Sequence, residues 1–317
     1  MRTAALLLVL ASSLAAQTPE KLYQERKLDE ARIAAKAKLA VNPNDGDALF
    51  WMGRVANAQN KNGEAIDWFE KAVKVDDKNA FYHLWLGNVV GNEAQNASPF
   101  RQPFLARRVK AEFERAVALD PTLLDARSGL VDFYTMAPGF MGGSDDKAKE
   151  QIAQMTKLNP SRGHQAAARF AQRRKDVPGE ERELKAAIAA APDSLAAIQY
   201  YPLAQFYRRQ SRWDEAFTTY DLILKLKPDE IVPHLGWGAT SVQSGKFLER
   251  GERELKQFLA LSTVEKVGPA NLSGGHYRLG MLYEKTARRD QARAEYTEAL
   301  KINPQYTDAK KALDNLK

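Results

Sequence analysis

The chain contains no cysteine among its 317 residues. Disulfide bonds, thiolate metal sites and cysteine nucleophiles are therefore excluded. Histidine is scarce as well, with only four residues, so few imidazoles are available for a metal site or a catalytic triad. A chain without thiols is suited to an oxidising compartment.

Long apolar runs are also missing. The run Ala4–Leu10 is shorter than the roughly 20 residues that span a bilayer. It follows Met1-Arg2 and precedes small residues at Ser13–Ala16, which is the order of a secretory signal peptide. We therefore expect cleavage of residues 1–16, no transmembrane segment in the mature chain, and a periplasmic or secreted protein.

What the chain does contain is enough apolar material for an extended core. Hydrophobic residues make up 44% of the sequence, and the mean hydropathy is −0.49. The stretch Ser273–Pro304 divides into two helical halves, each with one apolar face. Gly280 and Ala292 are small where two helix backbones would approach, and Tyr296 is large enough to fill the space beside them. This pattern predicts an antiparallel helix pair.

The same small–aromatic–small signature recurs along the chain before a helix-ending proline or aspartate. Its copies are Ala65, Phe69 and Ala72; Val109, Phe113 and Ala116; Ala148, Ile152 and Met155; Leu184 and Ala187; Ala216, Tyr220 and Ile223; and Ala292, Tyr296 and Ala299. The spacing of these copies fits a unit of about 34 residues with loop insertions. The chain resembles the tetratricopeptide repeat family, whose unit is a helix–turn–helix of that length.

This resemblance implies an all-α fold: a right-handed superhelical solenoid of antiparallel helix pairs with a C-terminal capping helix. The expected boundaries are a signal peptide at 1–16 and a single repeat domain at 17–317, comprising a partial unit at 19–43, units at about 46–79, 80–123, 124–162, 163–194, 195–230, 231–272 and 273–306, and a capping helix at 307–316. Insertions are expected at 92–101, 136–144 and 261–272.

The concave side is where such units bind partners, and the end of each first helix is expected to line it. The candidate partner-binding residues are Asn57, Asn88, Asn92, Arg174, Lys175, Arg208 and Arg209, together with Phe140 in a glycine-rich insertion. Four of these are cations in two neighbouring turns, so an acidic peptide is one expected partner; a solvated surface is the alternative. Nucleic acid is not expected, despite the net charge of +7, because no aromatics suited to base stacking alternate with the basic residues.

Two local motifs could carry chemistry, and both have a structural interpretation. Ser144 and Lys147 form a Ser-x-x-Lys pattern, but the companion motifs of penicillin-recognising enzymes are absent. Ser144, followed by Asp145 and Asp146, is typical of a helix N-cap. We expect no catalytic residue, cofactor or metal.

His83, His234 and His276 occupy one equivalent slot in their units. Helices that pack about 8–10 Å apart cannot bring one histidine per unit onto a single metal, so packing explains the pattern.

The sequence therefore predicts a non-catalytic protein–protein interaction scaffold of the bacterial cell envelope. Two alternatives remain open. One is a cell-wall or surface polysaccharide-binding module, which would use exposed aromatics such as Phe100, Phe104 and Phe140. The other is a hydrolase whose site is formed by the insertions.

Overall fold

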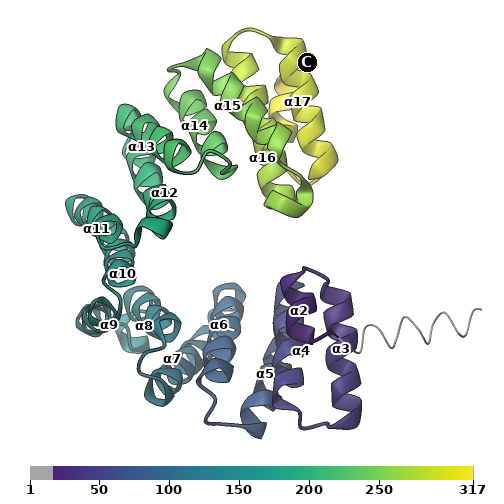
Figure 1. Ribbon diagram of the computed structural model, residues 1–317, viewed down its shortest axis with the longest axis vertical. Helices are drawn as coiled ribbons and strands as arrows, with labels where there is room; N and C mark the ends of the chain where they lie inside the picture. Colours follow the sequence, from purple (N-terminus) through teal and green to yellow (C-terminus); the bar gives the residue numbers. More distant parts are fainter. Residues whose placement is uncertain (1–16, 317) are drawn as a thin grey trace, which may run out of the picture. The chain divides into compact units, whose positions relative to one another are not determined.

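The computed structural model describes residues 17–316, and in that range every regular element is helical (Figure 1). This confirms the predicted fold class of a helical repeat solenoid. The expected signal peptide, residues 1–16, lies outside the described residues. None of the described helices combines the length and the hydrophobicity that a bilayer crossing requires. The chain divides into two compact units, residues 1–180 and 181–317, and the single repeat domain stays a prediction.

The N-terminal unit contains the following helices: α2 (Pro19–Gln24), α3 (Leu28–Val41), α4 (Gly46–Ala58), α5 (Asn62–Val75), α6 (Ala80–Asn96), α7 (Gln102–Leu119), α8 (Leu124–Met136), the short 3-10 helix η1 (Gly139–Met141), α9 (Asp145–Leu158), α10 (Pro160–Arg173) and the start of α11 (Val177–Ala189). The C-terminal unit continues with α12 (Asp193–Arg209), α13 (Trp213–Leu226), α14 (Val232–Ser244), α15 (Leu248–Leu261), α16 (Val264–Lys285), α17 (Arg289–Ile302) and α18 (Thr307–Asn315).

Within each unit the helices pack in chain order as pairs, for example α4 with α5, α6 with α7 and α16 with α17. First helices of successive pairs also contact one another directly, as α6 does with α8 and α14 does with α16. Because these first helices lie next to one another, their exposed faces lie on the same side of the stack. The repeated arrangement therefore creates a surface made of first helices alone.

The signature residues form the interior of each pair. Ala65, Phe69 and Ala72 are fully buried, and so are Ala292, Tyr296 and Ala299. The predicted close approach at Gly280 is also confirmed, because a Cβ atom there would lie 2.5 Å from Cε1 of Tyr296. Only glycine leaves room for that ring.

Two of the three expected insertions, 92–101 and 261–272, are partly absorbed into helices, whereas 136–144 forms the connection around η1. Much of 92–101 continues α6 to Asn96, and only the turn before Gln102 is irregular. The segment 261–272 mostly forms the beginning of α16, which is broken at Gly268 (φ 78°, ψ 157°) before Pro269. In 92–101 no helix breaker precedes Pro99, so extending α6, which has already begun, is favourable. In 261–272 a new helix begins instead, and the Thr263 side chain caps it by accepting from the backbone N–H of Lys266.

Candidate functional site

A groove on the N-terminal unit is lined mainly by three first helices, α4, α6 and α8. Its volume is about 790 Å³. The lining residues are Glu20, Asp47, Phe50, Trp51, Arg54, Asn79, Phe81, Tyr82, Leu84, Trp85, Asn88, Asp125, Ser128, Gly129 and Asp132. On each helix these positions recur every three to four residues, so each helix presents one face to the groove.

Aromatic rings pack against one another along α4 and α6. Phe50 stacks on Tyr82 with 5.5 Å between ring centroids, and Trp51 lies 5.4 Å from Tyr23. Trp85 lies 6.4 Å from Phe50. These rings give the groove a rigid apolar floor, because aromatic side chains have few rotatable bonds and large contact areas.

Arg54 is held in this floor by ring faces. Its guanidinium carbon lies 3.6 Å from the Trp85 centroid, 4.7 Å from that of Tyr23 and 5.3 Å from that of Trp51. Among the described residues no carboxylate pairs with Arg54, and its buried Nε has no hydrogen-bond partner. Cation–π contacts position the charge, and the donors of the guanidinium stay open to a bound acceptor.

Four carboxylates also line the groove, and all four already have partners. Glu20 Oε1 accepts a hydrogen bond from the Gln24 side-chain amide at 3.2 Å. Asp47 accepts a hydrogen bond from the Tyr82 hydroxyl at 3.3 Å. Burial is the main cause that raises the pKa of Tyr82 to about 12, and the charge of the Asp47 carboxylate is the second cause. Asp125 pairs with Arg162. Asp132 Oδ1 lies 3.8 Å from Nε of Arg169. The groove is therefore mixed in charge, since Arg54 and four carboxylates line it.

A second hollow, of about 440 Å³, adjoins the groove between α6, α7, α8 and η1. It shares Asn88, Gly129 and Asp132 with the groove, so the two spaces lie next to each other at those residues. Its walls are mostly apolar, and Phe113 and Phe133 are among the lining side chains.

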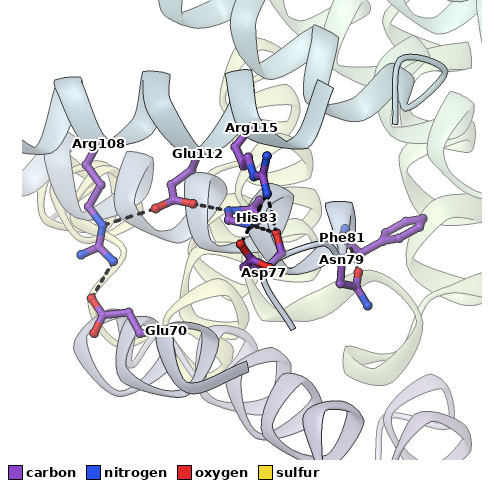
Figure 2. Close-up of polar contacts among 8 residues, drawn as sticks. All are labelled: Glu70, Asp77, Asn79, Phe81, His83, Arg108, Glu112 and Arg115. Atoms are coloured by element: carbon purple, nitrogen blue, oxygen red, sulfur yellow. Dashed lines mark hydrogen bonds and ion pairs between the residues drawn. The ribbon is translucent and has the colours of Figure 1, made fainter. Parts of the chain in front are cut away.

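A network of polar contacts joins α6 to α7, and α7 to α5 (Figure 2). His83 Nδ1 lies 2.7 Å from Glu112 Oε2 on α7, and Nε2 lies 3.0 Å from the backbone oxygen of Asp77. Arg108 then joins Glu112 to Glu70 on α5, with a 2.6 Å bond to Glu70. Figure 2 shows Phe81 pointing away from this cluster, consistent with its place in the groove.

The same histidine–glutamate contact recurs in other pairs. His234 Nδ1 lies 2.6 Å from Glu254 Oε2, and His276 Nδ1 lies 2.7 Å from Glu295 Oε2. Each histidine is on a first helix and each glutamate on the following second helix. The equivalent position of the three histidines is thus used for packing, as the sequence predicts. The contact of each histidine with a glutamate, called here the histidine clamp, was not predicted from the sequence. In residues 17–316 no group of three potential ligands is arranged to hold a metal ion.

The predicted partner-binding residues on α6 lie at these spaces. Asn88 lines both the groove and the adjoining hollow, and Asn92 lines the hollow. Asn57 is half-buried on α4 and does not line either space. Phe140 is 83% exposed in η1, next to Met141, which lines the hollow.

The predicted cations occupy other places. Nε of Arg174 donates to Asp145 at 2.9 Å, and its Nη2 donates to the backbone oxygen of Thr135 at 3.0 Å. This ion pair also lowers the pKa of Asp145. Lys175 is exposed at φ 59° in the adjoining turn. Arg208 and Arg209 end α12 in the C-terminal unit. A role for these four in partner binding stays a prediction.

Ser144 is the N-cap of α9, as predicted, with its Oγ accepting from the backbone N–H of Lys147 at 3.3 Å. The Lys147 ammonium lies 5.7 Å from the Tyr134 ring centroid. The Ser-x-x-Lys pattern is therefore explained by helix capping.

Sequence reasoning missed the central residues of the groove. The sequence pattern did not single out Arg54 or Trp85 as partner-binding residues. Their significance comes from rings that lie on α2, α4 and α6. The repeated spacing of Phe50, Arg54, Tyr82 and Trp85 on the faces of first helices is the signal that could have indicated them.

Two family models of the tetratricopeptide repeat match the chain, one over residues 20–80 and one over residues 273–306. No curated protein matches the sequence. Among solved structures, a tetratricopeptide repeat protein from Parabacteroides merdae is 12% identical with a TM-score of 0.49, covering 96% of this chain and 98% of that chain. A monomeric mutant of IFIT1 with Gppp-AAAA is 16% identical with a TM-score of 0.56, covering 94% of this chain and 70% of that chain. The IFIT1 likeness shows a shared fold alone.

Proposed function

Because the chain belongs to the tetratricopeptide repeat family, we propose that it binds a short segment of another protein in the groove formed by α4, α6 and α8. Repeats of this family generally bind proteins or peptides, and the fold is generally a non-catalytic scaffold. The observation that carries the proposal is Arg54: a positioned charge, stacked on Trp85 at 3.6 Å, with no carboxylate partner in the described chain.

The dimensions of the groove favour an extended segment. Three neighbouring helices at spacings of about 8–10 Å cover roughly 20 Å. About six residues of extended chain cover that length. The aromatic floor supplies apolar contact along the path, and the flanking polar side chains can bond the peptide backbone.

The charges of the groove favour a partner segment that carries both signs. A carboxylate of the partner fits Arg54, since a guanidinium binds carboxylates through two parallel hydrogen bonds. A cation of the partner fits the side of the groove where Asp132 lies. The acidic partner expected from the sequence is thus proposed in a modified form, with its acid opposite Arg54.

The test is selection of binders from a displayed library of random peptides, followed by calorimetric titration of the selected peptides. Arg54→Gln should weaken their binding about tenfold or more, because a charged hydrogen bond contributes about 1.5–3 kcal/mol. Arg253→Gln is the matched control, since Arg253 is exposed in the other unit. Selected peptides that bind the Arg54→Gln protein as tightly as the wild type would contradict the proposal.

We infer that the protein acts in the bacterial cell envelope after export. The support is the order of charged, apolar and small residues in 1–16 and the complete lack of cysteine. Mass spectrometry of the protein isolated from its cells should find an N-terminus at Ala16 or Gln17. A chain that retains Met1 through Leu14 would exclude this location.

A polysaccharide is the second candidate partner, and one observation favours it. Phe100, Phe104 and Phe140 are 88%, 72% and 83% exposed, and exposed aromatic rings are the groups that pack on sugar faces. Retention on a cell-wall glycan column, lost when all three are changed to alanine, would support this candidate. Passage of the wild-type protein through the column without retention would exclude it.

A further inference from the structure

The hollow beside the groove exists because one helix pair is longer than its neighbours. α6 and α7 have 17 and 18 residues, whereas α4 and α5 have 13 and 14. The extra turns at the end of α6 and the start of α7 extend past the 13-residue α8. The connection between α8 and α9, which contains η1, closes the far side through Met141.

The inner wall of the hollow is tightly packed around Phe113, but beside Gly91 it leaves open space. Phe113 fits tightly, because Cβ atoms built at Gly87 and Gly129 would lie 2.9 and 2.6 Å from its ring. Gly91 is different. A Cβ atom there would meet only Val109 Cγ2, at an ordinary contact distance of 3.8 Å. The space beside Gly91 is therefore open and bounded by apolar groups.

The mouth of the hollow is polar and has free hydrogen-bonding capacity. The side-chain amides of Asn88, Asn92 and Gln95 make no hydrogen bond to the described part of the chain. Asp132 is the single ionisable residue in the lining. Arg169 forms an ion pair with this carboxylate at 3.8 Å but lies beyond hydrogen-bond distance, so the carboxylate oxygens can still accept a hydrogen bond from a bound cation.

We propose that this hollow is a specificity pocket for one large apolar side chain of the bound segment, next to a lysine, an arginine or an α-amino group held by Asp132. The proposal rests on the proposed function and names the partner chemistry. Amides both donate and accept, which suits the peptide bonds on either side of the inserted residue. The negative Asp132 favours a cation, and Asn88, which lines both spaces, places the pocket beside the path of the peptide.

The volume agrees with this use. A space of about 440 Å³ falls in the range of about 300–1,000 Å³ typical of ligand pockets. An apolar side chain that enters this space leaves water and gains stabilisation from burial.

The experiment repeats the peptide selection with two pocket variants. Wild-type protein should enrich peptides that carry a large apolar residue beside Lys or Arg. Gly91→Leu fills the open space from α6 and should weaken binding of these peptides about tenfold or more, since burying one large apolar side chain contributes that much. Asp132→Asn should remove the preference for Lys or Arg and weaken binding up to about fivefold, while keeping the preference for the apolar residue.

Gly63→Leu is the matched control, because Gly63 is a helical glycine of α5 and a Cβ atom added there would have no other atom within 4 Å. It should leave binding unchanged. If Gly91→Leu binds the selected peptides as tightly as wild type while Arg54→Gln weakens them, the pocket is refuted and the groove function stands. If no peptide is enriched on the wild-type protein, both proposals are refuted. Circular dichroism of each variant establishes that the helices are intact.

Discussion

At the scale of single residues, a glycine on a first helix admits an aromatic ring from a second helix. The same relation holds for Gly53 with Phe69 and for Gly280 with Tyr296, where the added Cβ would lie 2.6 and 2.5 Å from ring carbons. The ring is fully buried in both cases. This pairing sets how closely the two helices approach, and the exposed faces of the first helices depend on it.

Gly280→Ala should therefore destabilise the protein. Overpacking costs about 1–3 kcal/mol, and the better helix propensity of alanine offsets up to about 1 kcal/mol. Gly63→Ala, at a helical glycine in open space, should instead raise the free energy of unfolding by up to about 1 kcal/mol. Urea denaturation of both variants measures the contrast, and equal effects would contradict the packing account.

The histidine clamps should also contribute in proportion to their burial. The side chains of His83 and Glu112 are 8% and 17% exposed, whereas those of the Lys301–Glu298 pair are 64% and 47% exposed. A double-mutant cycle on His83 and Glu112 should give a coupling energy of about 1–3 kcal/mol. The cycle on Lys301 and Glu298 should give about 0–0.5 kcal/mol. Coupling no larger at His83 than at Lys301 would refute a stabilising clamp.

Residue-level prediction from the sequence succeeded where the pattern was local. The shared slot of His83, His234 and His276 indicates packing because it repeats with the unit. Their glutamate partners could not be predicted, because each lies on the following helix, 19 to 29 positions away, and many glutamates are available. Arg54 was missed for the same reason, since its rings come from three helices.

At the scale of helices, arginines in the turns join each pair to the preceding one. Arg212 reaches Glu181 on α11 at 2.5 Å, and Arg288 reaches Glu252 on α15 at 2.7 Å. Each guanidinium also stacks on a tyrosine, Tyr207 or Tyr283, at 4.5 and 4.4 Å. Arg174 makes a similar contact with Asp145. A test of partner binding that changes Arg174 would therefore also disturb the packing of α9 and α10.

These contacts predict an acid-sensitive part of stability. The hydrogen bond from Arg212 is the main cause that lowers the pKa of Glu181 from the ordinary value of 4.5 to about 2. The hydrogen bond from Arg288 does the same for Glu252, whose pKa also falls to about 2. Because the folded pKa lies below the unfolded one, the stabilisation is present above about pH 4.5 and is lost as the pH falls toward about 2.

The double variant Glu181→Gln and Glu252→Gln should accordingly be less stable than wild type at neutral pH. The difference should shrink between about pH 4.5 and pH 2, as measured by urea denaturation across that range. Glu249→Gln, at an exposed residue of α15, serves as the control. A difference that stays constant with pH would mean that these ion pairs are not the cause.

Element boundaries were predictable where proline or glycine ends a helix, and less so elsewhere. The excess residues at 92–101 appeared as an insertion because they break the length of the unit. In the structure they lengthen α6 and precede a longer α7. The sequence could not show that this extra length opens a hollow, since a hollow depends on what the neighbouring α8 leaves uncovered.

At the scale of the whole molecule, the fold class followed from the sequence because each repeat is a local unit. A helix pair contacts mainly its neighbours in the chain, so a pattern within about 34 residues determines the packing. The surface proposed here to bind a partner was harder to predict, because its lining depends on the rotation of each first helix. The sequence indicated Asn88 and Asn92, which line the groove or the hollow. It also indicated cations near α10 and α12, whose role in partner binding stays a prediction.

The central claim is that this groove holds a segment of another protein. It is tested most directly by placing a photo-crosslinking amino acid at Asn88, where groove and hollow meet, and at Lys36, an exposed position on α3. After illumination in cell-envelope extract, mass spectrometry should find one short segment of one protein joined to position 88, absent at position 36 and lost with Arg54→Gln. Adducts of equal yield at both positions, or adducts that persist with Arg54→Gln, would contradict the account.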